Sequence, residues 1–238
     1  MVIAHVGGHD RGALTAFDAK TGAVRWRWSG DGPSYASPII VTSAGIRQVV
    51  TQTQKQCVGV STETGKLLWS FPFTTPYVQN AVTPVAVGDA IVLSGLQQGT
   101  FAIRIRKQGE HEVRPYRVWE TRDAWMYLSS PVAAGSTLYG MSEKRSGQLF
   151  SLSTATGKVL WTGEGRFGDN AAILDAGTAL LVLTPDASLH IYRKAGSALQ
   201  EAARYQVAES PTWATPAVVR NRILVKDQTS LTLWQVAE

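Results

Sequence analysis

The sequence contains a single cysteine, Cys57, and charged residues make up only 17% of it. One cysteine cannot form an internal disulfide, and cysteine usage therefore leaves the cellular compartment open. Long apolar runs are missing too, so we expect no transmembrane span. The first ten residues, MVIAHVGGHD, lack the basic and apolar regions of a signal peptide, so none is visible in this chain.

The chain also lacks a basic stripe. Its formal net charge is +5, and its densest positive stretch, residues 104–122, is interleaved with glutamates such as Glu112 and Glu120. We interpret this stretch as the solvated face of a strand and expect no nucleic-acid partner. No helical period of useful length is found either, so the sequence predicts an all-β fold.

What the sequence does contain is an eleven-residue phrase that occurs three times. The copies are AFDAKTGAVRW (residues 16–26), GVSTETGKLLW (residues 59–69) and SLSTATGKVLW (residues 151–161). A fourth unit ends at Trp119 without the Thr-Gly pair, and in a fifth unit we place Tyr205 at the tryptophan position. A period of about 40 to 50 residues is typical of propeller blades, each a four-stranded meander.

Each phrase predicts a tight hairpin followed by a buried tryptophan. The glycine of the turn needs a positive φ, and the Asp or Ser four residues before it can accept a hydrogen bond from the turn backbone. The tryptophan of the outer strand is expected to dock against the neighbouring sheet. The structural docking residues are Asp18, Gly22, Trp26, Gly65, Trp69, Gly157 and Trp161.

The first phrase resembles the tryptophan-docking motif of the pyrroloquinoline-quinone-like (quinoprotein-type) β-propeller repeats. That motif reads Ala, any residue, Asp, two residues, Thr-Gly, three residues, Trp, and residues 16–26 match every fixed position. The other two copies keep Thr-Gly and Trp, with Ser61 and Ser153 in place of Asp. The resemblance implies a superfamily of eight-bladed propellers that includes quinoprotein dehydrogenases and non-enzymatic bacterial propellers.

The repeat divides residues 1–238 into blade units of one β-propeller domain. The units are residues 1–29 (partial), 38–71, 84–121, 131–163, 172–207 and 216–236 (partial). The first lacks an inner strand and the last an outer one, which gives roughly 22 strands in all. We therefore expect the chain to be the C-terminal part of a longer, eight-bladed propeller. The alternative is a smaller ring that borrows its N-terminal strand to close.

Strand parity places the connections between successive units on one face and the Thr-Gly turns on the other. The first face collects polar and aromatic residues that predict a ligand site at the mouth of the channel. These candidates are Tyr35, Gln79, Asn80, Trp125, Tyr127, Asp169, Asn170 and Trp213. The alternative is that these loops are polar because they are exposed to solvent, and that Trp125 and Trp213 only fill the channel.

One cluster has the residue types of a metal site. His5, His9 and Asp10 lie in the Gly-rich stretch HVGGHDRG and could offer two imidazoles and a carboxylate to zinc or iron. Spacing alone does not place them on one side of the loop. A solvated or hydrogen-bonded loop is the alternative.

These features favour a non-catalytic propeller that acts as a binding or scaffold module for a protein or a small molecule. We find no catalytic residue and predict no cofactor. The alternative is a dehydrogenase dependent on pyrroloquinoline quinone and calcium, acting on alcohols or sugars, or a degenerate relative whose remaining site lies outside this chain. The vicinal disulfide of those enzymes is impossible here, because the chain has one cysteine. The resemblance also implies a bacterial protein of the periplasm or a secreted one.

Overall fold

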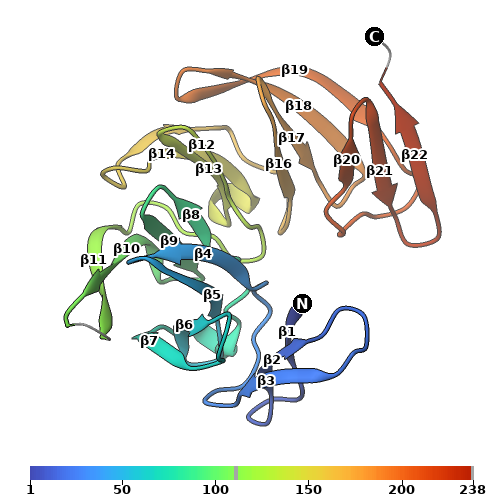
Figure 1. Ribbon diagram of the computed structural model, residues 1–238. Helices are drawn as coiled ribbons and strands as arrows, with labels where there is room; N and C mark the ends of the chain where they lie inside the picture. The colour runs from blue at the N-terminus through green and yellow to red at the C-terminus, as the bar shows by residue number, and fades with distance from the viewer. Residues whose placement is uncertain (110–111, 237–238) are drawn as a thin grey trace. The chain divides into compact units, whose positions relative to one another are not determined.

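The computed structural model describes residues 1–109 and 112–236. These residues form six antiparallel sheets, and within each sheet the strands that follow one another in the chain are neighbours (Figure 1). Four sheets have four strands and two have three. The prediction of an all-β chain built from four-stranded antiparallel meanders is confirmed.

The strands belong to two compact units, residues 1–127 with 155–157, and residues 128–154 with 158–238. The first unit holds three sheets and one short 3-10 helix. Its strands are β1 (Val2–Val6), β2 (Ala13–Phe17) and β3 (Val24–Trp28); β4 (Ile39–Ser43), β5 (Ile46–Gln52), β6 (Gln56–Ser61) and β7 (Leu67–Pro72); and β8 (Val85–Val87), β9 (Ala90–Gly95), β10 (Gly99–Lys107) and β11 (Val113–Thr121). The 3-10 helix η1 (Pro76–Val78) lies between β7 and β8.

The second unit also holds three sheets. Its strands are β12 (Val132–Ala134), β13 (Thr137–Ser142), β14 (Gln148–Ser153) and β15 (Val159–Thr162); β16 (Ala172–Ala176), β17 (Ala179–Leu183), β18 (Ser188–Ala195) and β19 (Ala198–Gln206); and β20 (Ala217–Val219), β21 (Arg222–Lys226) and β22 (Leu231–Gln235). The 3-10 helix η2 (Lys144–Ser146) joins β13 to β14. In both units the core consists of apolar side chains that project from the faces of adjacent sheets.

A bulge and a small residue accompany each motif tryptophan. The outer strand pairs with the strand before it around a β-bulge, which re-aims the side chain, and the tryptophan lies opposite a small residue. The pairs are Trp26 with Ala16, Trp69 with Gly59, Trp119 with Ala102, and Trp161 with Ser151. A Cβ on Gly59 would lie only 2.2 Å from Nε1 of Trp69. The small residue that opens the repeated phrase is therefore needed because the indole covers it.

The fifth repeat differs from the sequence prediction. The bulge between Ile191 and Tyr192 places Ala203, and not Tyr205, at the position equivalent to the motif tryptophan. Tyr205 pairs with Leu189 instead and is exposed. The prediction for Tyr205 is wrong because the aromatic side chain of β19 lies two residues after Ala203, the residue that the bulge places at the tryptophan position.

The Thr-Gly turn is closed by its own side chains. In the first turn Asp18 Oδ1 accepts hydrogen bonds from the backbone N–H groups of Lys20 and Thr21, both at 3.0 Å. The Arg25 guanidinium donates to Asp18 Oδ2 at 2.5 Å, and these bonds, the one from Arg25 foremost, lower the pKa of Asp18. In the second turn Ser61 Oγ accepts from the Thr64 N–H at 3.2 Å.

Trp26 packs beneath the Thr-Gly turn of the sheet that follows. Its Nε1–H donates to the backbone oxygen of Thr62 at 2.9 Å, and the residue is only 8% exposed. Gly65 has a φ of +72°, and a Cβ on it would lie 2.8 Å from the indole ring. Gly65 is thus required both for its backbone conformation and for the contact with Trp26.

The other two motif tryptophans of the first unit are also buried, but their contacts differ. Trp119 packs against Gly157 of the turn 155–157, where a Cβ would lie 2.3 Å from the ring. Trp69 is followed by a unit without the Thr-Gly pair, and its Nε1–H donates instead to Gln48 Oε1 at 2.5 Å within its own sheet. The partner of the indole therefore depends on whether the next repeat kept its turn.

Replacing Trp26 with Ala is expected to destabilise the protein by about 3–5 kcal/mol, because a buried aromatic side chain and its hydrogen bond are lost together. Urea unfolding followed by far-UV circular dichroism measures the change. A loss within about ±0.5 kcal/mol, the range of exposed sites, would contradict the docked position.

Gly22 and Gly65 form a matched pair that isolates the docking contact. Both have a positive φ, +73° and +72°, but within the described part of the chain no atom lies within 4 Å of a Cβ placed on Gly22. Gly22→Ala should cost about 1–2 kcal/mol from backbone strain alone. Gly65→Ala should cost clearly more in the same unfolding experiment, since its methyl group also collides with Trp26. Equal losses would show that the indole does not press on the turn.

Candidate functional site

Asn80 is the anchor of the loops that lead into β4 and β8. It is fully buried, and its Nδ2 donates to the backbone oxygens of Thr53 at 2.6 Å, Gln54 at 3.2 Å and Phe73 at 3.2 Å. Its own backbone oxygen accepts from the Ala36 N–H at 3.1 Å and from Ser34 Oγ at 2.7 Å. Asn80 therefore holds three loops together, and its side chain does not face solvent.

The loops that Asn80 ties together display two tyrosines. Tyr35 is 74% exposed and Tyr77, in η1, is 85% exposed. Tyr77 and Val78 have φ values of 62° and 57°, a region that non-glycine residues seldom adopt and that is a genuine outlier for a β-branched side chain. Such strain persists only where the surroundings enforce it, and it is concentrated at functional sites.

The remaining candidates of the first unit support this surface. The Tyr127 hydroxyl donates to Gln79 Oε1, so these two side chains are paired. Trp125 is half-buried and makes an interaction of its own. The structure thus gathers Tyr35, Gln79, Asn80 and Tyr127 around one set of tied loops, and of these four predicted residues only Tyr35 is largely exposed.

The second unit carries the other three candidates. Asn170 Oδ1 accepts from Ser129 Oγ at 3.2 Å, and that hydroxyl accepts from the Ala171 N–H at 2.8 Å. Asp169 is exposed beside it. Trp213 is 57% exposed, on a loop held by the bond from Thr212 Oγ1 to the Thr184 backbone oxygen at 2.8 Å. Trp213 is displayed much as Tyr35 is, whereas Asn170 ties its loop.

The residues proposed as metal ligands have other partners. His5 Nε2 lies 3.3 Å from the backbone oxygen of Asp31, whereas His9 Nδ1 lies 2.6 Å from the Gln54 amide and His9 Nε2 lies 3.6 Å from Asp10 Oδ2. Among residues 1–109 and 112–236 no group of three His, Cys, Asp or Glu side chains could hold a metal ion. The structure therefore does not assemble His5, His9 and Asp10 into a ligand set.

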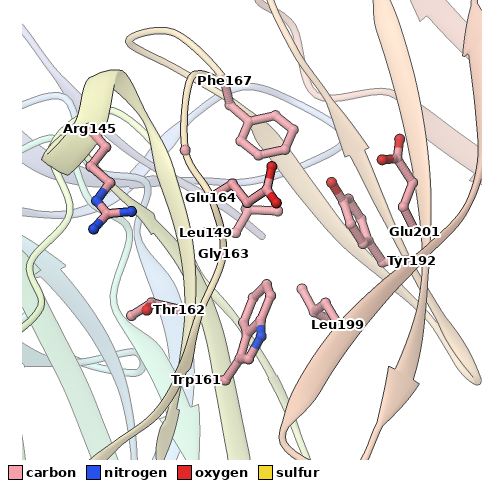
Figure 2. Close-up of a pocket in the computed structure, with 11 residues that line it drawn as sticks. Arg145, Leu149, Trp161, Thr162, Gly163, Glu164, Phe167, Tyr192, Leu199 and Glu201 are labelled. Atoms are coloured by element: carbon pink, nitrogen blue, oxygen red, sulfur yellow. The ribbon is translucent and has the colours of Figure 1, made fainter.

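A pocket of about 620 Å³ opens in the second unit (Figure 2). Its walls come from η2, β14, β15, β18, β19 and the segment that follows β15. Its aromatic and charged lining residues are Arg145, Trp161, Glu164, Phe167, Tyr192 and Glu201. Three aromatic rings and three charged groups thus line one hollow.

The comparison of the sequence with family models gives one match. The model described as outer membrane protein assembly factor BamB matches residues 1–163, more than half of the chain. The chain belongs to this BamB-like family of PQQ-repeat β-propellers. No curated protein sequence gives a significant match.

Solved structures show the same fold. The crystal structure of BamB from Moraxella catarrhalis superposes with a TM-score of 0.60 at 18% identity, covering 98% of this chain and 81% of that one. The β-propeller domain of Cps50 (Swd1) from Myceliophteria thermophila gives a TM-score of 0.61 at 13% identity, covering 96% of this chain and 78% of that one. At such identities the likeness establishes the propeller type of fold. Within the described residues no helix has the length and apolar character needed to cross a membrane.

Several residues of the tyrosine-bearing loops and of the pocket could not be predicted from the sequence. Tyr77 follows Pro76 in a loop, and no sequence pattern predicts its positive φ. Glu164 and Phe167 follow β15, whereas Tyr192 and Glu201 are paired across β18 and β19, and only tertiary packing brings these two pairs to one pocket. The one available signal was Trp161, whose following repeat lacks a Thr-Gly turn.

His5 makes the stability of the first unit dependent on pH. Burial lowers its pKa below 6.5, and the nearby oxygen atoms of Asp31 offset this only in part. The folded state therefore holds His5 neutral, and its contribution is present above pH 6.5 and lost as the pH falls through that value, where the unfolded chain binds the extra proton.

Between pH 7.5 and about pH 5 the free energy of unfolding should fall more steeply for the wild type than for His5→Gln. Urea titrations at several pH values measure the slope. An unchanged slope in His5→Gln would refute the neutral, buried state of this histidine.

Proposed function

We propose that this chain is a non-catalytic propeller that binds another protein through the tyrosine loops, defined as residues 33–37 and 74–80. The observation that carries the proposal is the display of Tyr35 and Tyr77 on backbone that Asn80 holds rigid. Tyrosine offers a large contact area and a hydroxyl at little cost in conformational entropy, and it is enriched at protein interfaces. A preorganised loop also loses little freedom when a partner binds.

The strained backbone supports the same interpretation. Tyr77 and Val78 could relax if nothing required their conformation, yet the loop keeps them at positive φ through hydrogen bonds from the Val78 and Gln79 N–H groups to Thr75 and Pro76. This strain costs stability and leaves the Tyr77 side chain almost wholly in solvent. A contact surface accounts for both features.

The family supports the compartment that we propose. Its description is that of an outer membrane assembly factor. We infer that this chain likewise acts outside the cytoplasm of a bacterium, in the periplasm. A scaffold that contacts partners through loops on a rigid β fold fits such a role.

Tyr35→Ala with Tyr77→Ala should reduce the capture of a specific partner by at least about tenfold, because two interface aromatics are removed. Immobilised wild type and variant are compared in extracts from the source organism at equal protein concentration, and bound proteins are quantified by mass spectrometry. The variant should stay folded, since exposed substitutions change stability by only about 0.5 kcal/mol.

Two further variants make the result specific. Tyr205→Ala removes an exposed tyrosine from β19 and should leave capture unchanged, whereas Trp213→Ala tests the loop of the second unit. Equal capture by the wild type and the double tyrosine variant would contradict the proposal. Stoichiometric uptake of pyrroloquinoline quinone with calcium would contradict the non-catalytic role and favour the dehydrogenase alternative.

A further inference from the structure

Trp161 differs in its indole N–H from the tryptophans that donate to protein oxygens. The N–H groups of Trp26, Trp69 and Trp234 donate to Thr62, Gln48 and Val207. Within the residues that the structure describes, Trp161 has no such acceptor. The turn between β18 and β19 does not provide an acceptor for it. Its backbone oxygens bond to other side chains: Ser197 accepts from Ser151 Oγ at 2.5 Å, and Gly196 accepts from the Tyr139 hydroxyl at 3.3 Å. The docking position of Trp161 is therefore open and forms one wall of the pocket (Figure 2).

A second polar group in the pocket is also unpaired. Tyr192 is only 6% exposed, yet its hydroxyl makes no hydrogen bond in the described part of the chain. Figure 2 shows this hydroxyl directed into the hollow, toward the side where Phe167 and Glu164 lie. Burial and the neighbouring Glu201 carboxylate raise the pKa of Tyr192, so the hydroxyl stays protonated and able to donate. This hydroxyl is open to the hollow and has no protein partner among the described residues, so it is available to a ligand or to water.

Acceptors complete the lining. Glu201 holds the buried His190 ring, with 2.8 Å between Oε1 and Nδ1, and that ring packs edge-on against Phe167 and stacks on Tyr192. The Glu164 carboxylate projects into the pocket (Figure 2) and has no ionic partner among residues 1–109 and 112–236. Arg145 and Thr162 also line the pocket, and their side chains lie on the side away from Trp161 in Figure 2. The pocket thus offers donors and acceptors side by side, between aromatic faces.

We propose that this pocket binds a sugar ring. A pyranose has apolar C–H faces for Trp161 and Phe167, and its hydroxyls can accept from the Trp161 N–H and Tyr192 O–H while donating to Glu164 and Glu201. An organic cation would leave the indole N–H without an acceptor and would face Arg145. An anion would face two carboxylates. A volume of about 620 Å³ is in the range of small-molecule sites. The site is separate from the tyrosine loops and does not depend on the proposed function.

The test uses glucose, maltose and chitobiose as probes of the intact chain. Saturation-transfer difference NMR reports binding and the ring protons that touch the protein, and titration to about 20 mM covers the weak affinity expected of a small neutral ligand. Trp161→Phe keeps an aromatic face but removes the N–H, and Tyr192→Phe removes only the hydroxyl. Each should weaken the binding of the best probe about five- to tenfold, the usual loss for one hydrogen bond.

Controls keep the interpretation specific. Tyr116→Phe, in β11 of the other unit, should bind as the wild type does, and circular dichroism verifies that every variant is folded. Saturation by glucose alone would indicate a free sugar as the natural ligand. Binding of only a disaccharide would indicate a glycan chain. The proposal is overturned if no probe binds at 20 mM, if both variants bind as the wild type does, or if n-butylammonium binds while the sugars do not.

Discussion

An indole ring that covers a small residue of its own sheet and lies beneath the glycine turn of the next sheet is the contact on which this fold depends. Trp26 shows it in full, with Ala16 opposite the ring, Gly65 above it and the Thr62 oxygen at its N–H. Separate sheets of three or four strands bury little surface alone. Where the next repeat keeps its Thr-Gly turn, one aromatic side chain fixes a sheet on its neighbour, and in Trp26 the N–H that it buries finds an acceptor there.

Because this contact recurs, much of the fold could be predicted from the sequence. Turn chemistry is local: Thr-Gly between two apolar runs allows few structures other than a hairpin, and Pro38 and Pro84 precede the short strands β4 and β8. Register is less local. A bulge shifts the pairing of the fifth hairpin, and spacing alone placed Tyr205 where the structure places Ala203. The repeat predicts which strands pair, and packing decides which residues face each other.

The candidate sites were less predictable, for a physical reason. A loop residue's role depends on where its side chain points, and composition does not reveal this. From the sequence, Asn80 and Tyr35 are equally good candidates for a ligand site. In the structure Asn80 is buried with three carbonyl partners, whereas Tyr35 projects into solvent. Tyr77 owes its display to a backbone conformation that no residue pattern announces. In the pocket, Glu164 follows β15 whereas Glu201 lies in β19, and only tertiary packing brings both to one hollow.

The same tryptophan position can therefore serve stability or recognition, according to what the next repeat supplies. Where the Thr-Gly turn is present, the indole N–H has an acceptor and the ring is sealed, as with Trp26. Where the turn is lost, the partner must come from elsewhere: Trp69 takes Gln48 within its own sheet. Trp161 has no such substitute in the described residues, and a pocket opens beside it. Loss of a turn thus converts a structural position into one that a ligand can occupy without disturbing the sheets around it.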